Sequence, residues 1–239
     1  MLNMGAAPLS MHGICSRLGQ TLLQQDCVLC GARSGDSPLC VHCRADLPTL
    51  SEQCPRCAIP SPNSCLCGTC LKSGPAYDAT HSLWRYDFPA DRLVQALKFR
   101  ARLALAAFFG NALAERFVPG AADIIVPMPL HRLRLAERGF NQAAEIARHM
   151  AHQTRTPFAP TAAARIKATL PQSDLTYEER SRNVRTAFRC NIDLRGMRVA
   201  VVDDVMTSGA TLAELALALK RSGAVRVENW VVTRTLSHV

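Results

Sequence analysis

Eight cysteines near the N-terminus recur with one fixed spacing, and this spacing restricts how the segment can fold. Two CxxC turns form a first set, and each of its cysteines has a counterpart 27 residues further along the chain. The first set is Cys27, Cys30, Cys40 and Cys43, and the second is Cys54, Cys57, Cys67 and Cys70. Four thiolates suit a tetrahedral ion at metal–sulfur distances of about 2.3 Å. The spacing therefore predicts two metal sites, with Zn²⁺ as the expected structural ion in each.

Other uses of these cysteines stay open at the level of the sequence. Disulfides, buried free thiols and iron–sulfur clusters also employ closely spaced cysteines. Cys65 falls outside the common register but lies close enough to Cys67 to replace it as a ligand, whereas Cys15 and Cys190 stand apart. Residues 1–25 show no secretion signal, so we expect a reducing compartment, where metal ligation is favoured over disulfides.

The cysteine-rich segment is short of apolar residues and has no net charge. Its three arginines are balanced by three acids, which are Arg33, Arg44 and Arg56 against Asp36, Asp46 and Glu52. We expect metal binding to supply most of the folding free energy of this segment. The formal net charge of +9 lies outside it, so the segment alone is a poor clamp for a phosphate backbone.

Beyond residue 71 the pattern changes to helices and strands. We expect an N-terminal segment at 1–26 with a short helix between Ile14 and Leu22, a double zinc ribbon at 27–70 and an α/β domain at 71–239. Apolar periodicity predicts helices at Asp91–Phe117, Asn141–His152 and around Leu212–Leu219, and strands at Asp123–Val126, Val199–Val202 and Val225–Val232. The strand at Val199–Val202, the helix around Leu212–Leu219 and the strand at Val225–Val232 follow one another and form a βαβ unit, which predicts a parallel sheet with flanking helices.

The segment after the strand at Val199–Val202 carries the most specific chemistry. Asp203 and Asp204 stand at the strand end, where carboxylates can accept hydrogen bonds from vicinal sugar hydroxyls. The loop into the next helix is Thr207, Ser208, Gly209, Ala210 and Thr211. Hydroxyls and backbone N–H groups at such a helix start can hold a phosphate. An ordinary helix cap would explain one hydroxyl but not two consecutive acids.

This block resembles the motif with which type I phosphoribosyltransferases bind phosphoribosyl pyrophosphate (PRPP). More of the chain is similar to the ComF/GntX family, in which a zinc ribbon precedes a phosphoribosyltransferase-like domain. The matching segments are Leu97–Phe99, Val126–Leu130 and Arg138–Gln142, and the matching single residues are Arg165, Gln172, Arg180, Asn183 and Phe188. The resemblance implies a type I phosphoribosyltransferase-like parallel sheet with flanking helices, preceded by a small cysteine-rich double zinc ribbon.

The resemblance also implies roles for particular residues. Asp203 and Asp204 would hold the ribose hydroxyls of PRPP, and residues 207–211 its 5′-phosphate. The candidates for the loop that contacts pyrophosphate are Pro127, Met128, Pro129, Leu130 and Arg138. The polar stretch Leu170–Arg189 would form a hood that closes over PRPP. Mg²⁺ is implied because a pyrophosphate leaving group needs its charge neutralised.

Three functions follow from these expectations. The first is a ComF-like PRPP-binding protein with a role in DNA uptake, competence or nucleotide metabolism, with single-stranded DNA and competence-machinery proteins as candidate partners. The second is an active phosphoribosyltransferase that moves phosphoribose from PRPP to a nitrogen acceptor. The third is a PRPP sensor without turnover. The sequence identifies neither a catalytic residue nor an acceptor pocket.

Composition narrows the class of partner. The charge of +9 favours an anionic ligand, whereas an aromatic content of 5% disfavours a base-stacking surface of the kind that reads RNA sequences. Since no stretch approaches the length of a membrane span, we expect a cytoplasmic protein without membrane insertion.

Overall fold

The computed structural model describes residues 25–167 and 186–236. The predicted N-terminal helix and most of the predicted hood, with Gln172, Arg180 and Asn183, lie outside these ranges. The chain forms two compact units, Met1–Asp46 and Leu47–Val239. The division falls between the two cysteine sets, whereas the change in composition falls near residue 71. Within the described ranges, no helix is long and apolar enough to cross a bilayer.

The smaller unit is organised around the first cysteine set. Its described residues form β1 (Gln25–Asp26), β2 (Arg33–Gly35) and α2 (Val41–Ala45), and the two strands pair antiparallel. The N–H of Cys27 donates to the carbonyl oxygen of Ala32 at 2.7 Å, which closes the first CxxC turn.

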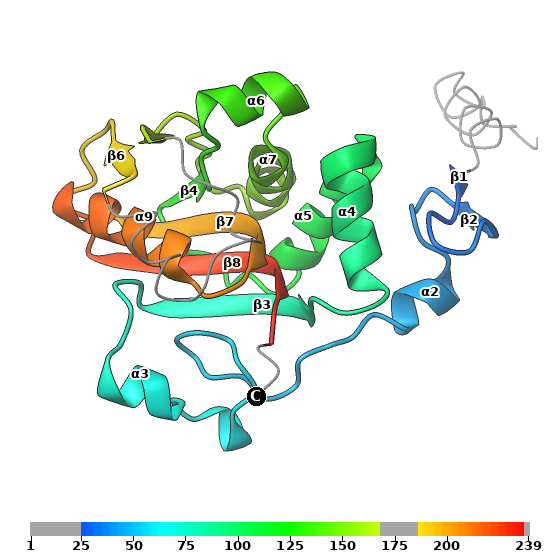
Figure 1. The fold of residues 1–239 in the computed structure, drawn as a ribbon, viewed down its shortest axis with the longest axis horizontal. Helices are drawn as coiled ribbons and strands as arrows, with labels where there is room; N and C mark the ends of the chain where they lie inside the picture. The colour runs from blue at the N-terminus through cyan, green and yellow to red at the C-terminus, as the bar shows by residue number, and fades with distance from the viewer. Residues whose placement is uncertain (1–24, 168–185, 237–239) are drawn as a thin grey trace, which may run out of the picture. The chain divides into compact units, whose positions relative to one another are not determined.

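The larger unit is built on a sheet of four strands, all parallel (Figure 1). Their order across the sheet is β3 (Ala79–Arg85), β8 (Arg226–Arg234), β7 (Arg198–Met206) and β4 (Ile124–Pro127). The two central strands, β7 and β8, are almost entirely buried and have apolar middle sections, as expected where helices cover both faces. The predicted α/β fold with a parallel sheet is confirmed.

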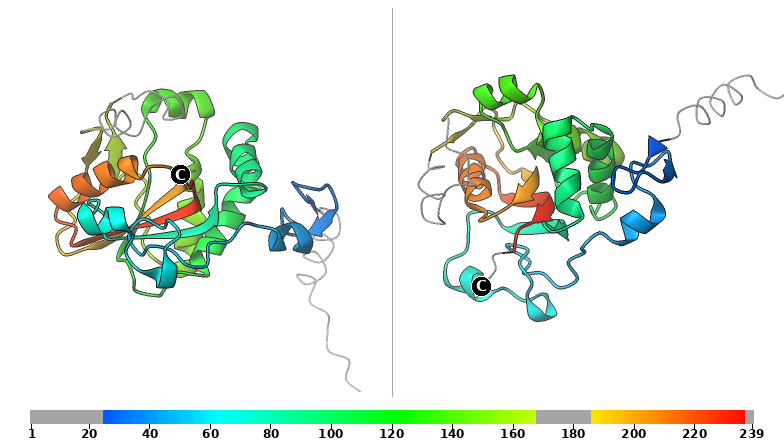
Figure 2. Two further views of the ribbon diagram at one scale, coloured as in Figure 1. Left: turned by 60° about the horizontal axis from the view of Figure 1, so that its bottom comes forward. Right: turned by 45° about the vertical axis from the view of Figure 1, so that its right-hand side comes forward.

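Helices cover both faces of this sheet (Figure 2). On one face α9 (Ala210–Arg221) packs against β8, and its stripe of Leu212, Leu215 and Leu219 joins the main apolar cluster. On the other face α7 (Gln142–Thr154) packs against β7 and β4, and α5 (Ala104–Ala114) packs against β8. The remaining elements are α3 (Gly68–Lys72), the 3₁₀ turn Pro62–Ser64, α4 (Ala90–Arg100), α6 (Arg132–Arg138), β5 (Ala163–Arg165) and β6 (Phe188–Cys190).

The predicted single helix over Asp91–Phe117 is wrong, because the structure breaks it into α4 and α5. The break lies at Ala101, whose φ of 48° is left-handed and ends α4. An alanine in this conformation pays a steric cost, and no glycine or proline marks the position in the sequence. The break turns α4 away from α5 and brings Lys98, near its end, to the sheet.

The strand over Val199–Val202 is longer than predicted. β7 runs from Arg198 to Met206, so Asp203 and Asp204 lie inside the strand and not at its end. β8 is longer as well and reaches Arg234. Both strands therefore extend to the edge of the sheet at which the loop 207–209 begins.

The outer side of β3 is covered by the segment that leads into the second cysteine set. The N–H of Thr80 donates to the carbonyl oxygen of Pro55 at 3.0 Å, and the N–H of Arg85 donates to that of Pro48 at 2.8 Å. Gln53 adds a side-chain bond to the carbonyl oxygen of Ser82. These bonds attach the segment that contains the start of the second CxxC turn to β3.

Gly110 sets the distance between α5 and α7. A Cβ at this position would lie 2.6 Å from the Cβ of His149 and 2.6 Å from the carbonyl oxygen of Ile146. We expect Gly110→Ala to lower the free energy of unfolding by about 1–3 kcal/mol through overpacking, measured by urea denaturation.

Asn111, exposed on the next position of α5, provides the control. Asn111→Ala should leave stability unchanged or raise it slightly, because alanine is the better helix former. A Gly110→Ala variant as stable as Asn111→Ala would contradict this account of the helix contact.

Candidate functional site

The loop between β7 and α9 is shaped by one glycine. Gly209 is the N-cap of α9 and has a φ of 80°, which favours glycine. A Cβ there would also lie 2.7 Å from Cε of Met206 and 2.7 Å from Oη of Tyr77. Ser208 adds a local bond, in which its Oγ accepts from the N–H of Ala210 at 3.3 Å. The loop is therefore held close against the buried residues beneath it.

The two consecutive acids point to opposite faces of the sheet, because side chains alternate along a strand. Asp203 faces the α9 side and lines a cavity there, and its Oδ1 accepts from the N–H of Asp204 at 2.9 Å. Asp204 faces α4, where its Oδ2 lies 2.7 Å from Nζ of Lys98. Both carboxylates are buried, with exposed fractions of 9% and 3%.

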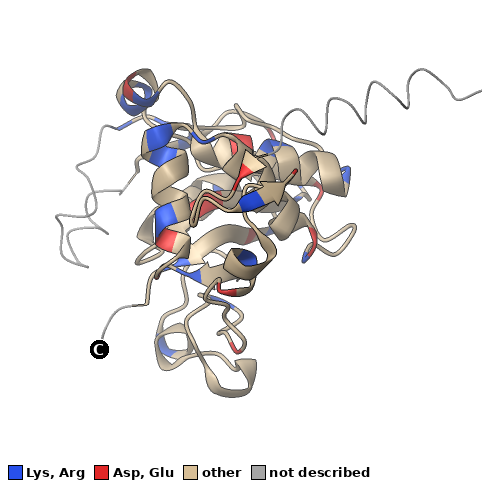
Figure 3. Cartoon of the chain, turned by 90° about the vertical axis from the view of Figure 1, so that its right-hand side faces the viewer, with Lys and Arg blue, Asp and Glu red and all other residues tan. Residues whose placement is uncertain are grey.

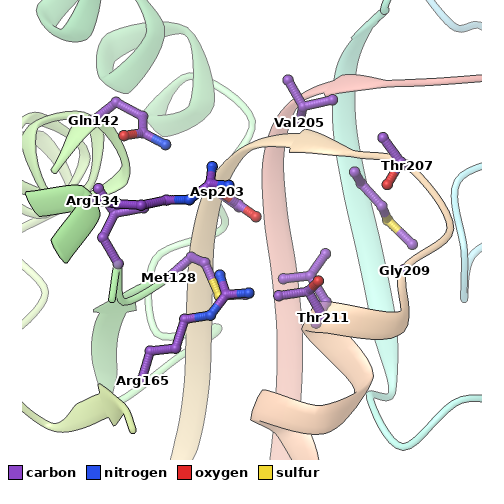
Figure 4. Close-up of a pocket in the computed structure, with 12 residues that line it drawn as sticks. Met128, Arg134, Gln142, Arg165, Asp203, Val205, Thr207, Gly209 and Thr211 are labelled. Atoms are coloured by element: carbon purple, nitrogen blue, oxygen red, sulfur yellow. The ribbon is translucent and has the colours of Figure 1, made fainter. Parts of the chain in front are cut away.

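The cavity beside Asp203 has a volume of about 170 Å³. Figure 4 shows Arg134 extending toward Asp203, while Arg165 lies between Met128 and Thr211. The full lining is Met128, Leu130, Arg134, Gln142, Arg165, Asp203, Val205, Met206, Thr207, Gly209, Thr211 and Leu212. Two guanidinium groups, one carboxylate and a helix N-terminus thus converge where the strands end, which is where ligands bind in open α/β sheets.

The loop after β4 is fixed against this cavity by Asn141. The Oδ1 of Asn141 accepts from the N–H groups of Ala143 and Ala144, which caps α7, and its Nδ2 donates to the carbonyl oxygen of Met128 at 3.0 Å. Gly139, at a φ of 81°, ends α6 just before it. This explains why glycine and asparagine stand so close together in the segment Arg138–Gln142.

The two cysteine sets each bring four sulfur atoms within 4.8 Å of one another. Sγ of Cys30 lies 3.8 Å from that of Cys40, and Sγ of Cys57 lies 3.6 Å from that of Cys67. A tetrahedral ion at about 2.3 Å from each thiolate requires sulfur atoms about 3.8 Å apart, whereas a disulfide needs about 2.05 Å. The predicted grouping is confirmed, and Cys65 lies outside the second group.

Comparisons with known proteins decide the family. The chain is 33% identical to the DNA utilization protein YhgH of Salmonella typhimurium over 206 residues, which cover 83% of this chain and 91% of that protein. The chain belongs to the ComF/YhgH family. Competence protein F of Haemophilus influenzae is 28% identical over 87% of this chain and 90% of its own length. Competence protein ComFC of Bacillus subtilis is 24% identical over 84% of this chain and 85% of its own.

Other comparisons add less. No family model matches the chain. Glutamine PRPP amidotransferase from Bacillus subtilis is similar in structure with a TM-score of 0.37 and 21% identity, over 53% of this chain and 25% of that one. A purine phosphoribosyltransferase from Pyrococcus horikoshii has a TM-score of 0.32 and 21% identity, over 54% of this chain and 80% of its own.

In this ComF-family chain the predicted site residues divide between the cavity and its surroundings. Asp203, Thr207, Gly209 and Thr211 line the cavity, as do Met128 and Leu130 of the predicted pyrophosphate loop. The other predicted residues do not line it, and these are Asp204, Ser208, Ala210, Pro127, Pro129 and Arg138. Arg138 instead lies over the ring of Phe99, with 5.6 Å between its Cζ and the ring centroid.

Sequence reasoning missed three contributions to this site. Gln142 lines the cavity, and its Oε1 accepts from Nη1 of Arg138 at 2.5 Å. Lys98 pairs with Asp204, and Arg165 enters the cavity from β5. Lys98 and Arg165 stood in segments that matched the family, but their spacing along the chain gave no sign of a shared site.

The thiols of the ComF-family cysteine sets are polarised by the backbone. Although burial opposes ionisation, N–H groups of Cys40, Cys30 and Leu29 lower the pKa of Cys27 to about 6. Burial likewise opposes ionisation of Cys54, and N–H groups that include that of Cys67 lower its pKa to about 7. Each set therefore contains one thiol already disposed to act as a thiolate ligand.

Burial raises the pKa of Asp203 well above the usual range of an aspartate, and the charge of Asp204 raises it further against the opposing effect of Lys98. The folded state thus binds a proton at Asp203 more tightly than the unfolded state does. Stability is therefore lost as the pH rises from the ordinary aspartate range through this raised value. Above the ordinary aspartate range, Asp203 therefore lowers the free energy of unfolding.

Asp203→Asn removes this penalty, because asparagine cannot ionise. We expect the variant to melt above the wild type at pH 7, and each kcal/mol gained corresponds to roughly 2–4 °C in Tm for a domain of this size. The gain should shrink near pH 4, where the Asp203 carboxyl is protonated in the unfolded state as well as in the folded state. Differential scanning calorimetry at both pH values measures it.

Asp123→Asn gives a control of opposite sign. Hydrogen bonds from Arg198 lower the pKa of Asp123 to about 2, so the ionised form of this exposed carboxylate stabilises the folded state. Its loss should reduce Tm slightly at pH 7. An Asp203→Asn variant that also melts below the wild type at pH 7 would contradict the assignment.

Proposed function

We propose that this ComF-family protein binds PRPP with Mg²⁺ in the cavity beside Asp203. The observation that carries the proposal is the meeting of a buried carboxylate with the glycine-shaped start of α9 in one cavity. A sugar that bears both a phosphate and vicinal hydroxyls matches these two features. The two arginines in the lining match the further negative charge of a pyrophosphate.

Each part of PRPP has a partner in this proposal. Asp203 accepts from the ribose hydroxyls, and the loop from Thr207 to Thr211 holds the 5′-phosphate through hydroxyls and backbone N–H groups. Arg134 and Arg165 engage the pyrophosphate beside the Met128–Leu130 loop. Asp204 acts through Lys98, since its carboxylate lies on the other face of the sheet.

The donor set also fits Mg²⁺, which prefers carboxylate and phosphate oxygens. Asp203 supplies the protein carboxylate in the cavity, and PRPP supplies its own oxygens. The ion would neutralise charge on the pyrophosphate. The raised pKa of Asp203 fits this arrangement, because a nearby cation stabilises the carboxylate that burial disfavours.

The two cysteine sets hold structural Zn²⁺ in this proposal. Four thiolates at each set leave no open position for a substrate, so neither ion takes part in catalysis. Thiolate ligands of this kind persist in reducing compartments, which suits a cytoplasmic protein.

The role that we propose for PRPP binding is in DNA uptake or nucleotide metabolism. The relatives are named for DNA utilization and competence, and this supports the first use. Transfer of phosphoribose to a nitrogen acceptor and sensing of PRPP without turnover are the alternatives. Release of pyrophosphate from PRPP in the presence of candidate bases separates the enzyme from the other two.

The binding proposal predicts the effect of removing both charges at the strand. Asp203→Asn with Asp204→Asn should weaken PRPP binding by about 10–100-fold, because hydrogen bonds to charged groups contribute about 1.5–3 kcal/mol. Isothermal titration calorimetry with PRPP and Mg²⁺ measures the change. The exposed Asp123→Asn should bind as the wild type does, and unchanged affinity in the double variant would remove the premise of the proposal.

A second function, binding of single-stranded DNA, is favoured by a cleft next to the PRPP cavity. It has a volume of about 570 Å³ and shares Arg134 with that cavity. Its other lining residues are Lys98, Phe99, Ala101, Glu137, Arg138 and Phe140. Its three basic residues come from two helices, Lys98 from α4 and Arg134 and Arg138 from α6, and Figure 3 marks the Lys and Arg residues on the ribbon. Basic and aromatic side chains together form the usual surface for unpaired bases.

Phe99 is the residue that tests this second function. Its side chain is 74% exposed beside Arg138, and stacking of one base on an aromatic ring contributes about 1–3 kcal/mol. We expect Phe99→Ala to weaken binding of a fluorescent oligothymidine by about 5-fold or more in anisotropy titrations, with PRPP affinity unchanged.

Phe88 supplies a matched control, because it is equally exposed and lies before the opposite end of α4. Phe88→Ala should leave the DNA affinity as it is. Equal losses in both variants, or none in either, would count against the cleft as the DNA site. Binding that does not weaken with added salt would count against contacts with the phosphate backbone.

A further inference from the structure

The second cysteine set is part of the apolar core that supports the phosphate loop. Cys54, Cys57 and Cys70 are buried and belong to the same cluster as Met206 and Leu212, which flank the loop on β7 and α9. The first set lies in the other compact unit, and its Cys30 is exposed. The same spacing in sequence therefore yields two different environments.

One side chain, Arg234 at the end of β8, joins the second set to the loop. It is buried, with 7% of its surface exposed. Its Nε donates to the carbonyl oxygen of Cys57 at 2.9 Å. Its Nη1 donates to the carbonyl oxygens of Met206, at 3.2 Å, of Thr207, and of Thr235, at 2.6 Å. A single guanidinium thus ties the CxxC turn to the point where β7 becomes the loop.

The charge of Arg234 is matched to this position. A buried guanidinium is costly unless it is paired or fully hydrogen-bonded, and backbone carbonyls satisfy this one. Four thiolates around one divalent ion leave an excess of negative charge, which attracts the guanidinium toward Cys57. Without the ion, the CxxC turn loses its links to the other two cysteines of the set, and the carbonyl oxygen that accepts from Arg234 is held less rigidly.

Packing beneath the loop leaves it little freedom to move. Tyr77, which follows the second cysteine set in sequence, is 2% exposed, and its Oη would lie 2.7 Å from a Cβ on Gly209. Met206 closes the other side at the same distance. The position of the loop N–H groups therefore depends on the residues below, which belong to the cluster that contains Cys54 and Cys57.

We infer that the metal-bound second cysteine set and Arg234 together position the loop Thr207–Gly209 to receive a phosphate. The inference rests on the proposed function, because it concerns the same PRPP cavity. Arg234 is a positioning residue that contacts no substrate. The first cysteine set has no part in this task, so the two ions have unequal effects on PRPP binding.

The first experiment replaces Arg234 in the full chain. Arg234→Met should keep about two zinc ions per chain by metal analysis, and should bind both PRPP and ribose 5-phosphate about tenfold more weakly in calorimetric titrations. Ribose 5-phosphate reports on the phosphate loop without pyrophosphate. Arg234→Lys keeps the charge but loses the planar set of guanidinium donors. Its affinities for both ligands should lie between those of the wild type and those of Arg234→Met.

Arg226→Met is the matched control for this experiment. Arg226 lies on the same strand, β8, but it is exposed at the opposite end and bonds to Glu228. The variant should keep both the metal content and the two affinities. A loss equal to that of Arg234→Met would show that any arginine of β8 matters, and would overturn the specific role of Arg234.

The second experiment compares the two cysteine sets. A Cys54→Ser, Cys57→Ser chain and a Cys27→Ser, Cys30→Ser chain should each retain about one zinc ion, and only the former should bind PRPP more weakly. Hydrogen exchange without ligand provides a readout that is independent of binding. The amides of residues 206–209 should exchange faster in the former chain and in Arg234→Met, but not in the latter chain.

The outcomes separate the inference from the proposed function. If the wild type binds neither PRPP nor ribose 5-phosphate, the proposed function fails, while the exchange data still test the coupling. If the wild type binds PRPP, and loss of the second ion and of Arg234 changes neither affinity nor exchange, the inference fails alone. If the Cys54→Ser, Cys57→Ser chain does not fold, the affinities and exchange rates of Arg234→Met, which keeps its full metal content, test the inference.

Discussion

The alternation of side chains along β7 is the constraint on which the site depends. Because successive residues face opposite sides of the sheet, the two acids lie in different environments. Asp203 lines the cavity, whereas Asp204 forms an ion pair with Lys98. β7 is paired with β4 up to Val202 and with β8 through Asp203 and beyond, so the strand geometry holds the two acids on opposite faces. The ion pair with Lys98 consequently ties α4 to the centre of the sheet, and α4 in turn forms a wall of the neighbouring cleft.

The two cysteine sets show how an internal duplication can diverge in role while its ligands stay in register. The first set organises a small unit, whose described residues, 25–46, form two short strands and one short helix. In the second set, the buried cysteines pack in the apolar core together with residues of α9, and the CxxC turn accepts a hydrogen bond from the outer side of β3. The same cysteines that are grouped as candidate metal ligands in this set also form part of the domain core.

Local patterns predicted much of this molecule. Two kinds of local pattern were sufficient. Apolar periodicity within short segments identified β7, α9 and β8, and the repeated CxxC spacing identified the two cysteine sets. The end of α4 at Ala101 was not predicted. Alanine is a common helix residue, so nothing in the local sequence indicates that this one adopts a left-handed conformation. The continuation of β7 through two acids escaped for a related reason, since burial of charge is decided by a partner on another element. The bond between Arg234 and Cys57 joins residues 177 positions apart, and no local pattern reports such a contact.

The segment along the outer side of β3 has a further consequence for the protein in solution. β3 is the last strand of the sheet on that side, and an uncovered strand offers its N–H and C=O groups to any other chain. Pro48 and Pro55 accept bonds from β3, and a proline has no N–H to offer outward from the same positions. At these two positions the segment therefore covers β3 without offering an N–H group to which another chain could pair, which disfavours association of two molecules through this edge.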